Sequence, residues 1–147
     1  MIIGITGTNG AGKGTVVDYL VQKGFHHYSM REAITEEIIR RGLPVTRTNM
    51  NEVATDLRKK YGADYYTTYF MADAAAKGIA DYIIESIRNP KEAENICNHG
   101  GLIWVVDADK HIRFERIMAR KSVTDQISFD EFVKQEDREM TSEDPND

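Results

Sequence analysis

A glycine-rich segment directly after an apolar run constrains this chain more than any other feature. Residues 7–15 read Gly-Thr-Asn-Gly-Ala-Gly-Lys-Gly-Thr and follow an apolar segment at 1–6. A run that is apolar on both faces is typical of a central parallel strand. Glycines let the backbone turn its N–H groups around phosphate oxygens, and a helix that begins at once adds the positive end of its dipole. The segment therefore predicts a strand, a phosphate-binding loop and a helix in that order.

The loop residues have expected roles in holding a nucleotide. Lys13 supplies a mobile charge for the β- and γ-phosphates. Gly14 stands where the pattern G-x-x-x-x-G-K-[ST] has a hydroxyl, so the hydroxyl expected to meet magnesium is that of Thr15. ATP and Mg²⁺ are the expected cofactors, contacted by Gly7, Asn9, Gly10, Ala11, Gly12, Lys13, Gly14 and Thr15. A glycine-rich turn without a ligand is the alternative, and the strand and helix around the loop argue against it.

Composition limits the size and class of the protein. A chain of 147 residues fits one domain, expected at 1–140 and followed by an acidic tail at 141–147. The net charge of -5 argues against a general nucleic-acid binder, and no apolar stretch reaches the ~20 residues of a membrane span. The single cysteine, Cys97, allows no internal disulfide, and we expect it to be buried. We predict a cytoplasmic protein with neither nucleic-acid nor membrane partners.

Strand and helix patterns alternate along the chain. Apolar runs predict strands at 1–6, 25–29, 79–84 and 102–106, the last buried like the first. Helices are predicted near 13–23, 32–41, 49–61, 65–77, 90–98, 110–121 and 128–140. The buried face of the 65–77 helix is expected to carry Tyr66, Tyr69, Phe70 and Ala74. This order predicts a three-layer α/β/α fold with a mainly parallel sheet of four or five strands and a ligand at their carboxyl ends.

Two short polar segments follow predicted strands and would reach the loop. Ser29 and Arg31 follow the second strand, where Arg31 could clamp the phosphate of an acceptor; a solvated arginine at a helix start is the alternative. Glu85 and Arg88 follow the third strand. Glu85 could position magnesium through water or take the acceptor proton, and Arg88 could hold an anionic group. The alternative for this second pair is a local ion pair.

Three arginines at helical spacing predict a lid. Arg113, Arg116 and Arg120 lie on one face of a helix, before a polar loop, so a short lid is expected near 113–127. Closure would bring Arg116 or Arg120 onto the transferring phosphoryl group and exclude water. A solvated cationic stripe paired with Glu115 is the alternative.

The remaining polar candidates are weaker. Asp107 and Asp109 could bind a metal, but we expect Asp109 to cap the following helix. The four histidines lack the spacing of metal ligands and are assigned to no site.

Six segments, taken in order, resemble the dephospho-CoA-kinase-like branch of the P-loop kinases. They are residues 7–15, Tyr-Ser-Met-Arg-Glu, Arg-Arg-Gly-Leu-Pro, Leu-Arg-Lys-Lys-Tyr-Gly-Ala-Asp, Glu-Ser-Ile-Arg-Asn-Pro-Lys-Glu-Ala and Arg-Phe-Glu-Arg-Ile-x-x-Arg. That branch is related to adenylate and other nucleoside monophosphate kinases, and similar domains precede deoxycytidylate deaminase domains. The resemblance implies a P-loop NTPase fold, ATP with magnesium at 7–15, an acceptor region near Arg31 and Arg88, and a lid around Arg116 and Arg120.

The function expected from these features is ATP-dependent phosphotransfer to a small nucleotide-like acceptor, of the nucleoside monophosphate or dephospho-CoA type. Lys13, Glu85, Arg116 and Arg120 would be catalytic, and Thr15 and Glu85 would serve the metal. The alternative is a regulatory module that binds a nucleotide with little or no turnover. Similar proteins usually continue beyond the Glu-Asp-Pro-Asn segment with a last strand and an adenine-contacting loop. A homodimer through an exposed sheet edge is one way to supply these.

Overall fold

The computed structural model describes residues 1–120 and 127–140. Its elements are β1 (Ile2–Thr6), α1 (Lys13–Gln22), β2 (His26–Ser29), α2 (Met30–Arg40), α3 (Arg47–Tyr61), α4 (Tyr65–Lys77), β3 (Tyr82–Glu85), α5 (Pro90–Asn98), β4 (Leu102–Val105), α6 (Lys110–Ala119) and α7 (Phe129–Met140). The predicted order of strands and helices is confirmed. The third strand begins at Tyr82 instead of residue 79, because the N–H of Ile79 bonds the Ala74 carbonyl and closes the end of α4.

The four strands form a parallel sheet in the order β2-β3-β1-β4. The register pairs Ile5 with both Glu85 and Trp104, and Ser29 with Glu85, so the carboxyl ends of the strands meet at one edge. From β1 the chain crosses to β2 at one edge of the sheet, and from β3 it crosses in the opposite direction to β4 at the other edge. Ligands of open parallel sheets bind at such a point, where the connections leave on opposite faces.

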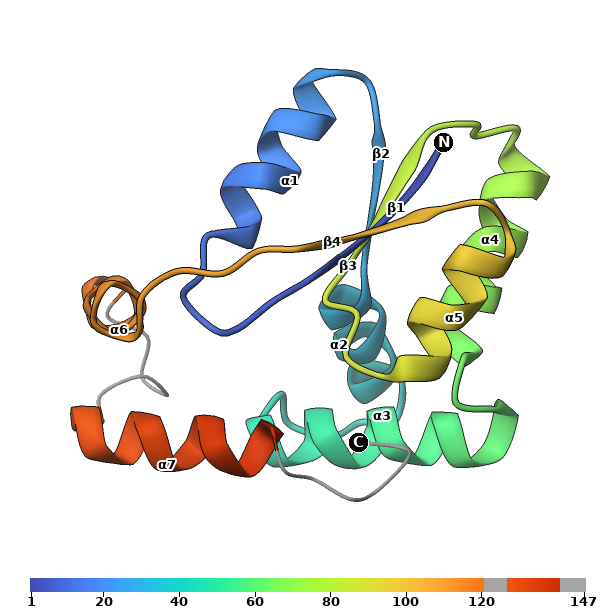
Figure 1. The fold of residues 1–147 in the computed structure, drawn as a ribbon. Coiled ribbons are helices and arrows are strands. Elements are labelled where there is room, and N and C mark those ends of the chain that lie inside the picture. Colours follow the sequence, from blue (N-terminus) through green and yellow to red (C-terminus); the bar gives the residue numbers. More distant parts are fainter. Residues whose placement is uncertain (121–126, 141–147) are drawn as a thin grey trace.

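Helices cover both faces of the sheet, and each face has its own apolar cluster (Figure 1). On the α1 side the buried cluster is small and consists of Ile3, Ile5, Val17, Leu20 and Ile83. On the other side α2, α3, α4 and α5 bury a larger cluster, with Ile38, Tyr66, Ile84 and Ile96 among its members. The predicted α/β/α class with a parallel sheet of four strands is therefore confirmed.

Three burial predictions are wrong. β4 is an edge strand, and Leu102, Trp104 and Val105 are 53%, 40% and 71% exposed, because an apolar run does not itself say which strands lie beside it. Tyr69 is 54% exposed because it continues a stack of tyrosine rings on the outer side of α4. Cys97 is exposed because it lies on the outer face of α5, whose buried residues are Glu92 and Ile96.

No helix in the described ranges combines the length and the apolar character that crossing a bilayer requires.

Candidate functional site

The glycines of the loop between β1 and α1 allow its tight path. A Cβ on Gly7, at φ +139°, would lie 1.9 Å from the carbonyl oxygen of Val106, so only glycine fits there. Gly10 and Gly12 also have positive φ, +79° and +100°. Gly14 differs, since a Cβ added there would meet nothing within 4 Å. The first turn of α1 therefore faces open space at Gly14.

The start of α1 has donors suited to an anion. Gly12 is the N-cap and has no side-chain oxygen to accept from the first N–H groups of the helix, which are the groups that phosphate oxygens can accept from. The Nζ of Lys13 donates to the carbonyl oxygens of Gly7 and Thr8, at 2.8 and 2.9 Å, and so lies back over the loop. Thr15 is exposed in the first turn. The residues present fit a bound nucleotide phosphate.

Glu85 lies at the end of β3, beside the loop, and is the centre of a charged group. Its Oε2 is 3.0 Å from Nε2 of His27 on β2, and both side chains are about three-quarters buried. The hydrogen bond from His27 lowers the pKa of Glu85, and the charges of Lys13 and Arg31 lower it further. The same hydrogen bond raises the pKa of His27 against the opposing effect of burial. Glu85 is therefore a carboxylate within electrostatic range of cations from β2, α1 and α2.

A strained turn fixes Glu85 against β1. Ser86 has φ 71°, and it is the one non-glycine residue in the described ranges with a positive φ. The N–H groups of Ser86 and Ile87 both donate to the carbonyl oxygen of Ile5, at 3.0 and 3.1 Å, and Oγ1 of Thr6 donates to the Ile87 carbonyl at 2.6 Å. These three bonds hold the end of β3 to the strand that leads into the loop.

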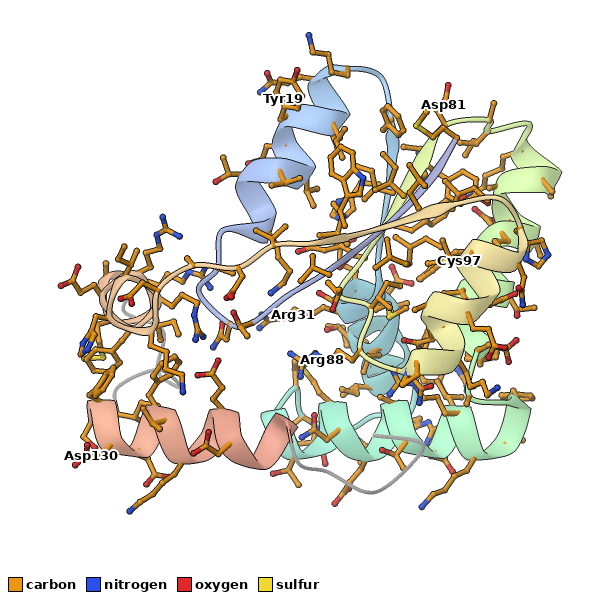
Figure 2. All side chains as sticks on the ribbon, viewed as in Figure 1. Tyr19, Arg31, Asp81, Arg88, Cys97 and Asp130 are labelled. Atoms are coloured by element: carbon orange, nitrogen blue, oxygen red, sulfur yellow. The ribbon has the colours of Figure 1, made fainter. Side chains whose placement is uncertain are left out.

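The residues predicted to bind the acceptor lie at the same end of the sheet. Figure 2 shows Arg31 and Arg88 where β2 and β3 end, with Asp81 at the opposite end. Both arginines are exposed. Ser29 is the N-cap of α2 and accepts from the N–H of Glu32 at 3.3 Å, so its hydroxyl already has a structural partner.

The segment that carries Arg88 is held by the start of α5 and by an ion pair with α3. Asn89 and Glu92 form a reciprocal capping box at the start of α5, and Glu92 is fully buried. Its Oε1 pairs with the buried guanidinium of Arg58 on α3 at 3.0 Å, and its Oε2 accepts from the Asn89 N–H at 3.3 Å. Burial raises the pKa of Glu92 even though Arg58 opposes the shift. The ion pair thus ties α3 to the Arg88 turn.

The three arginines of α6 lie in different environments. Arg113 is 3% exposed and holds the loop to α7: its Nη1 is 2.7 Å from Glu136 and donates to the Asn9 carbonyl at 3.3 Å. Arg116 is exposed and donates to the carbonyls of Gly10 and Ala11, at 3.3 and 3.2 Å. Arg120 is exposed at the end of α6. Most of the polar part of the predicted lid, 121–126, lies outside the described residues.

The two aspartates after β4 hold backbone groups. Asp109 accepts from the N–H groups of His111 and Ile112, so its predicted role as a helix cap is confirmed. Asp107 accepts from Thr8 Oγ1 at 3.1 Å and from the Ala108 N–H at 2.8 Å, and these bonds lower its pKa. In the described ranges no three His, Cys, Asp or Glu side chains gather as a metal site. Mg²⁺ in phosphate-transfer sites commonly takes only one or two protein ligands and completes its shell with phosphate and water.

His27 is the site residue that sequence reasoning missed. It lies on β2, and Glu85 lies on β3, 58 positions later in the chain. Only the pairing of β2 with β3 brings them together, with Ser29 opposite Glu85 and His27 two residues earlier on the same face. His27 and Ser29 are two residues apart, which places them on the same face of a strand. That spacing points to Glu85 only once β3 is known to be the neighbour of β2.

Comparison with known proteins gives the family. The sequence profile of the AAA domain family matches residues 3–141, nearly the whole chain. The chain belongs to the AAA domain family. A UPF0200 protein of Methanothermobacter thermautotrophicus is 30% identical to this chain over 147 residues. The match covers 95% of this chain and 72% of that protein, so the chain also belongs to the UPF0200 proteins. The UPF0200 protein of Pyrococcus horikoshii is 28% identical, covering 95% of this chain and 78% of its own.

Two solved structures share the fold of this AAA domain protein. TT1252 from Thermus thermophilus matches with a TM-score of 0.58 and 23% identity, over 96% of this chain and 81% of that one. An unliganded sugar kinase from Janibacter sp. matches with a TM-score of 0.50 and 16% identity, over 98% and 79%. The AAA domain match and the loop geometry together support the P-loop, nucleotide-binding class.

Proposed function

We propose that this protein is an ATP-dependent kinase that transfers a phosphoryl group to a small nucleotide-like acceptor, of the nucleoside monophosphate or dephospho-CoA type. The observation that carries the proposal is the position of Glu85, which lies within electrostatic range of Lys13 from the loop and of Arg31 from α2. A carboxylate within range of both a donor-side and an acceptor-side cation suits the transfer of phosphate between two anionic molecules. The sugar kinase with the same fold is consistent with this class of reaction.

The donor would be held by the loop. Its N–H groups and Lys13 would bind the β- and γ-phosphates of ATP, and Thr15 and Glu85 would serve Mg²⁺, Glu85 through a bound water. The metal held there would supply positive charge that offsets part of the phosphate charge. Glu85 is suited to accept hydrogen bonds because its neighbours favour the ionised form by lowering its pKa.

The acceptor would be held by Arg31 and Arg88, which lie where β2 and β3 end. During transfer an acceptor oxygen bonds to the γ-phosphorus while the bond from that phosphorus to the bridging oxygen of ADP breaks, and ADP carries the electron pair away. A phosphate acceptor attacks as an oxyanion, whereas a hydroxyl acceptor would give its proton to Glu85. Lys13 would meet the developing charge, and Arg116 and Arg120 would approach from α6. His27 would hold the Glu85 carboxylate in place through its 3.0 Å contact.

The test is ADP release from Mg-ATP with AMP, CMP, dCMP, dTMP and dephospho-CoA as acceptors. One acceptor should stimulate ADP release, and Lys13→Ala should lower that rate by about 10²–10³-fold. Lys23→Ala is the matched control, since Lys23 follows α1 at the end remote from the loop and should retain the rate. If no acceptor stimulates release while calorimetry shows that ATP binds, the kinase proposal fails and a nucleotide-binding regulatory module takes its place.

A further inference from the structure

Consecutive carbonyl groups of the phosphate-binding loop accept hydrogen bonds from two arginines of α6. Nη1 of Arg113 donates to the Asn9 carbonyl at 3.3 Å. Nη1 of Arg116 donates to the carbonyls of Gly10 and Ala11, at 3.3 and 3.2 Å. The two backbones are so close that a Cβ on Gly10 would lie 2.6 Å from the carbonyl oxygen of Arg113. The loop that leads from β1 into α1 therefore presents its carbonyl side to α6 (Figure 1).

The direction of these carbonyls decides where the N–H groups of the loop point. In a planar trans peptide the C=O of one residue and the N–H of the next point in opposite directions. The N–H groups of Gly10, Ala11 and Gly12 therefore point away from α6. That of Ala11 donates to the Thr8 carbonyl at 3.3 Å, and those of Gly10 and Gly12 are donors that suit a nucleotide phosphate. Turning a carbonyl away from α6 would also turn the next N–H away from the phosphate.

Arg113 is a buried cation, and Glu136 of α7 balances its charge. The side chains of Arg113 and Glu136 are 3% and 13% exposed. Nη1 of Arg113 is 2.7 Å from Oε1 of Glu136, and Nη2 donates to Oε2 at 3.1 Å, so the pair is bidentate. Nε donates to the Ala108 carbonyl at 2.8 Å, and the guanidinium lies over the ring of Phe132. Lys110 is a second cation near Glu136, at 3.8 Å and 49% exposed. Arg113 is thus held from α7 while it holds the loop.

The loss of Glu136 would change the position of Arg113. A buried charge that loses its partner is strongly disfavoured, so the guanidinium would turn toward solvent or toward another carboxylate. Asp107 offers one, because its side chain is 72% exposed and its Oδ1 is 3.9 Å from Nε of Arg113. Either movement would break the contact between Nη1 and the Asn9 carbonyl. The conformation of the loop therefore depends on a side chain of α7.

We propose that Glu136 is a positioning residue for nucleotide binding. By holding Arg113 against the Asn9 carbonyl, it keeps the phosphate-binding loop in the conformation that binds phosphate. α7 thus contributes to nucleotide affinity through Arg113. The inference rests on the nucleotide site of the proposed function, and it is independent of which acceptor receives the phosphoryl group.

Electrostatics and positioning predict opposite effects when Glu136 is neutralised. A carboxylate close to the loop repels phosphates, so by charge alone its removal would tighten the binding of ADP. The loss of positioning weakens the binding of ADP, because the loop N–H groups are no longer held toward the phosphates. The sign of the change in Kd therefore separates the two effects.

The test is calorimetric titration of the full chain with Mg-ADP. Glu136→Met should raise Kd by about tenfold, and Glu136→Gln, equally neutral but with an oxygen that can still accept from Arg113, by about threefold. Asp130→Asn is the matched control, because it also removes one carboxylate from α7, at an exposed position, and it should keep Kd within about twofold. Circular dichroism shows that each variant is folded at the temperature of the titration. If Glu136→Met loses helix signal, Glu136→Gln carries the test.

A double-mutant cycle shows whether Glu136 acts through Arg113. Arg113→Met should itself weaken ADP binding, and the addition of Glu136→Met should then raise Kd by less than about twofold more. The proposal is overturned if folded Glu136 variants bind ADP as tightly as the unchanged chain or more tightly, or if Glu136→Met has its full effect in the Arg113→Met background.

The titration also separates this proposal from the kinase reaction. If the unchanged chain binds Mg-ADP and the variants behave as expected, but no acceptor is phosphorylated, the kinase reaction fails and the positioning role of Glu136 stands. If the unchanged chain does not bind Mg-ADP, both proposals fail.

Discussion

Replacing Arg58 by methionine should destabilise the protein by about 3–5 kcal/mol at neutral pH, because it leaves a charged carboxylate buried. Glu92 is 0% exposed and Arg58 6%, and the guanidinium contacts Oε1 through two nitrogens, each at 3.0 Å. Glu92 also accepts hydrogen bonds from two backbone N–H groups, at 3.3 Å from Asn89 and 3.5 Å from Arg88. With total stabilities of about 5–15 kcal/mol, such a loss is a large fraction.

The loss should shrink in acid. Burial already raises the pKa of Glu92, and without the guanidinium this pKa rises further. An acid whose pKa is raised on folding binds its proton more tightly in the folded state, so stability falls as pH rises from the unfolded pKa, ordinarily 4.5, to the folded one. That fall is at most about 1.4 kcal/mol per pH unit. The variant should therefore recover about 2 kcal/mol between about pH 7 and about pH 5.

Urea unfolding followed by circular dichroism at both pH values measures these differences. Lys59→Met, at the exposed neighbouring position, is the matched control and should change stability by less than about 0.5 kcal/mol. Adding Glu92→Gln to Arg58→Met should restore part of the loss, because the amide oxygen still caps α5 and carries no charge. The reasoning is refuted if Arg58→Met costs no more than Lys59→Met, or if its cost is the same at both pH values.

Three further predictions concern the site. Gly7→Ala should lower stability by more than about 2 kcal/mol, measured by thermal unfolding, because its Cβ would overlap the Val106 carbonyl; a silent variant would contradict this. His27→Gln should cost about 1 kcal/mol, chiefly between pH 4.5 and 6.5. Because the pKa of His27 is raised on folding, its contribution to stability is complete below pH 6.5 and is lost as pH rises through the folded-state pKa. Because the pKa of Glu85 is lowered, its contribution is complete above pH 4.5 and is lost as pH falls through the folded-state pKa. A flat difference across pH would argue against the pair. Arg113→Met should expose α7 to proteolysis, whereas Arg120→Met should not, because only Arg113 is buried against α7.

Local sequence signals predicted the elements well, because the features that define them are short in range. The loop glycines, the Asp109 cap and the proline at the start of α5 each act within a few residues. The strand ends that hold Arg31, Glu85 and Arg88 followed from apolar runs and the rule that parallel strands gather their carboxyl ends. These parts of the site could therefore be located before the sheet order was known.

The features that sequence missed depend on which elements become neighbours. His27 reaches Glu85 only because β3 lies between β2 and β1. Arg113 shares its helix face with Arg116 at the spacing expected, yet α7 covers one and leaves the other exposed. The apolar run of β4 resembles that of β1, and strand order alone makes one central and the other an edge. Pairing over long separations is not encoded in any local window.

The unequal size of the two apolar clusters has a consequence for local unfolding. α1, the helix that follows the glycine-rich loop, is held by the smaller cluster through Val17 and Leu20. The larger cluster on the opposite face is formed by residues of four helices and the sheet. Segments with fewer buried contacts open more often, and amide hydrogen exchange reports that opening. A ligand that binds only the closed form raises the free energy of opening by RT ln(1 + [L]/Kd). A nucleotide at the loop would therefore slow exchange most in α1, the layer that the protein's own core protects least.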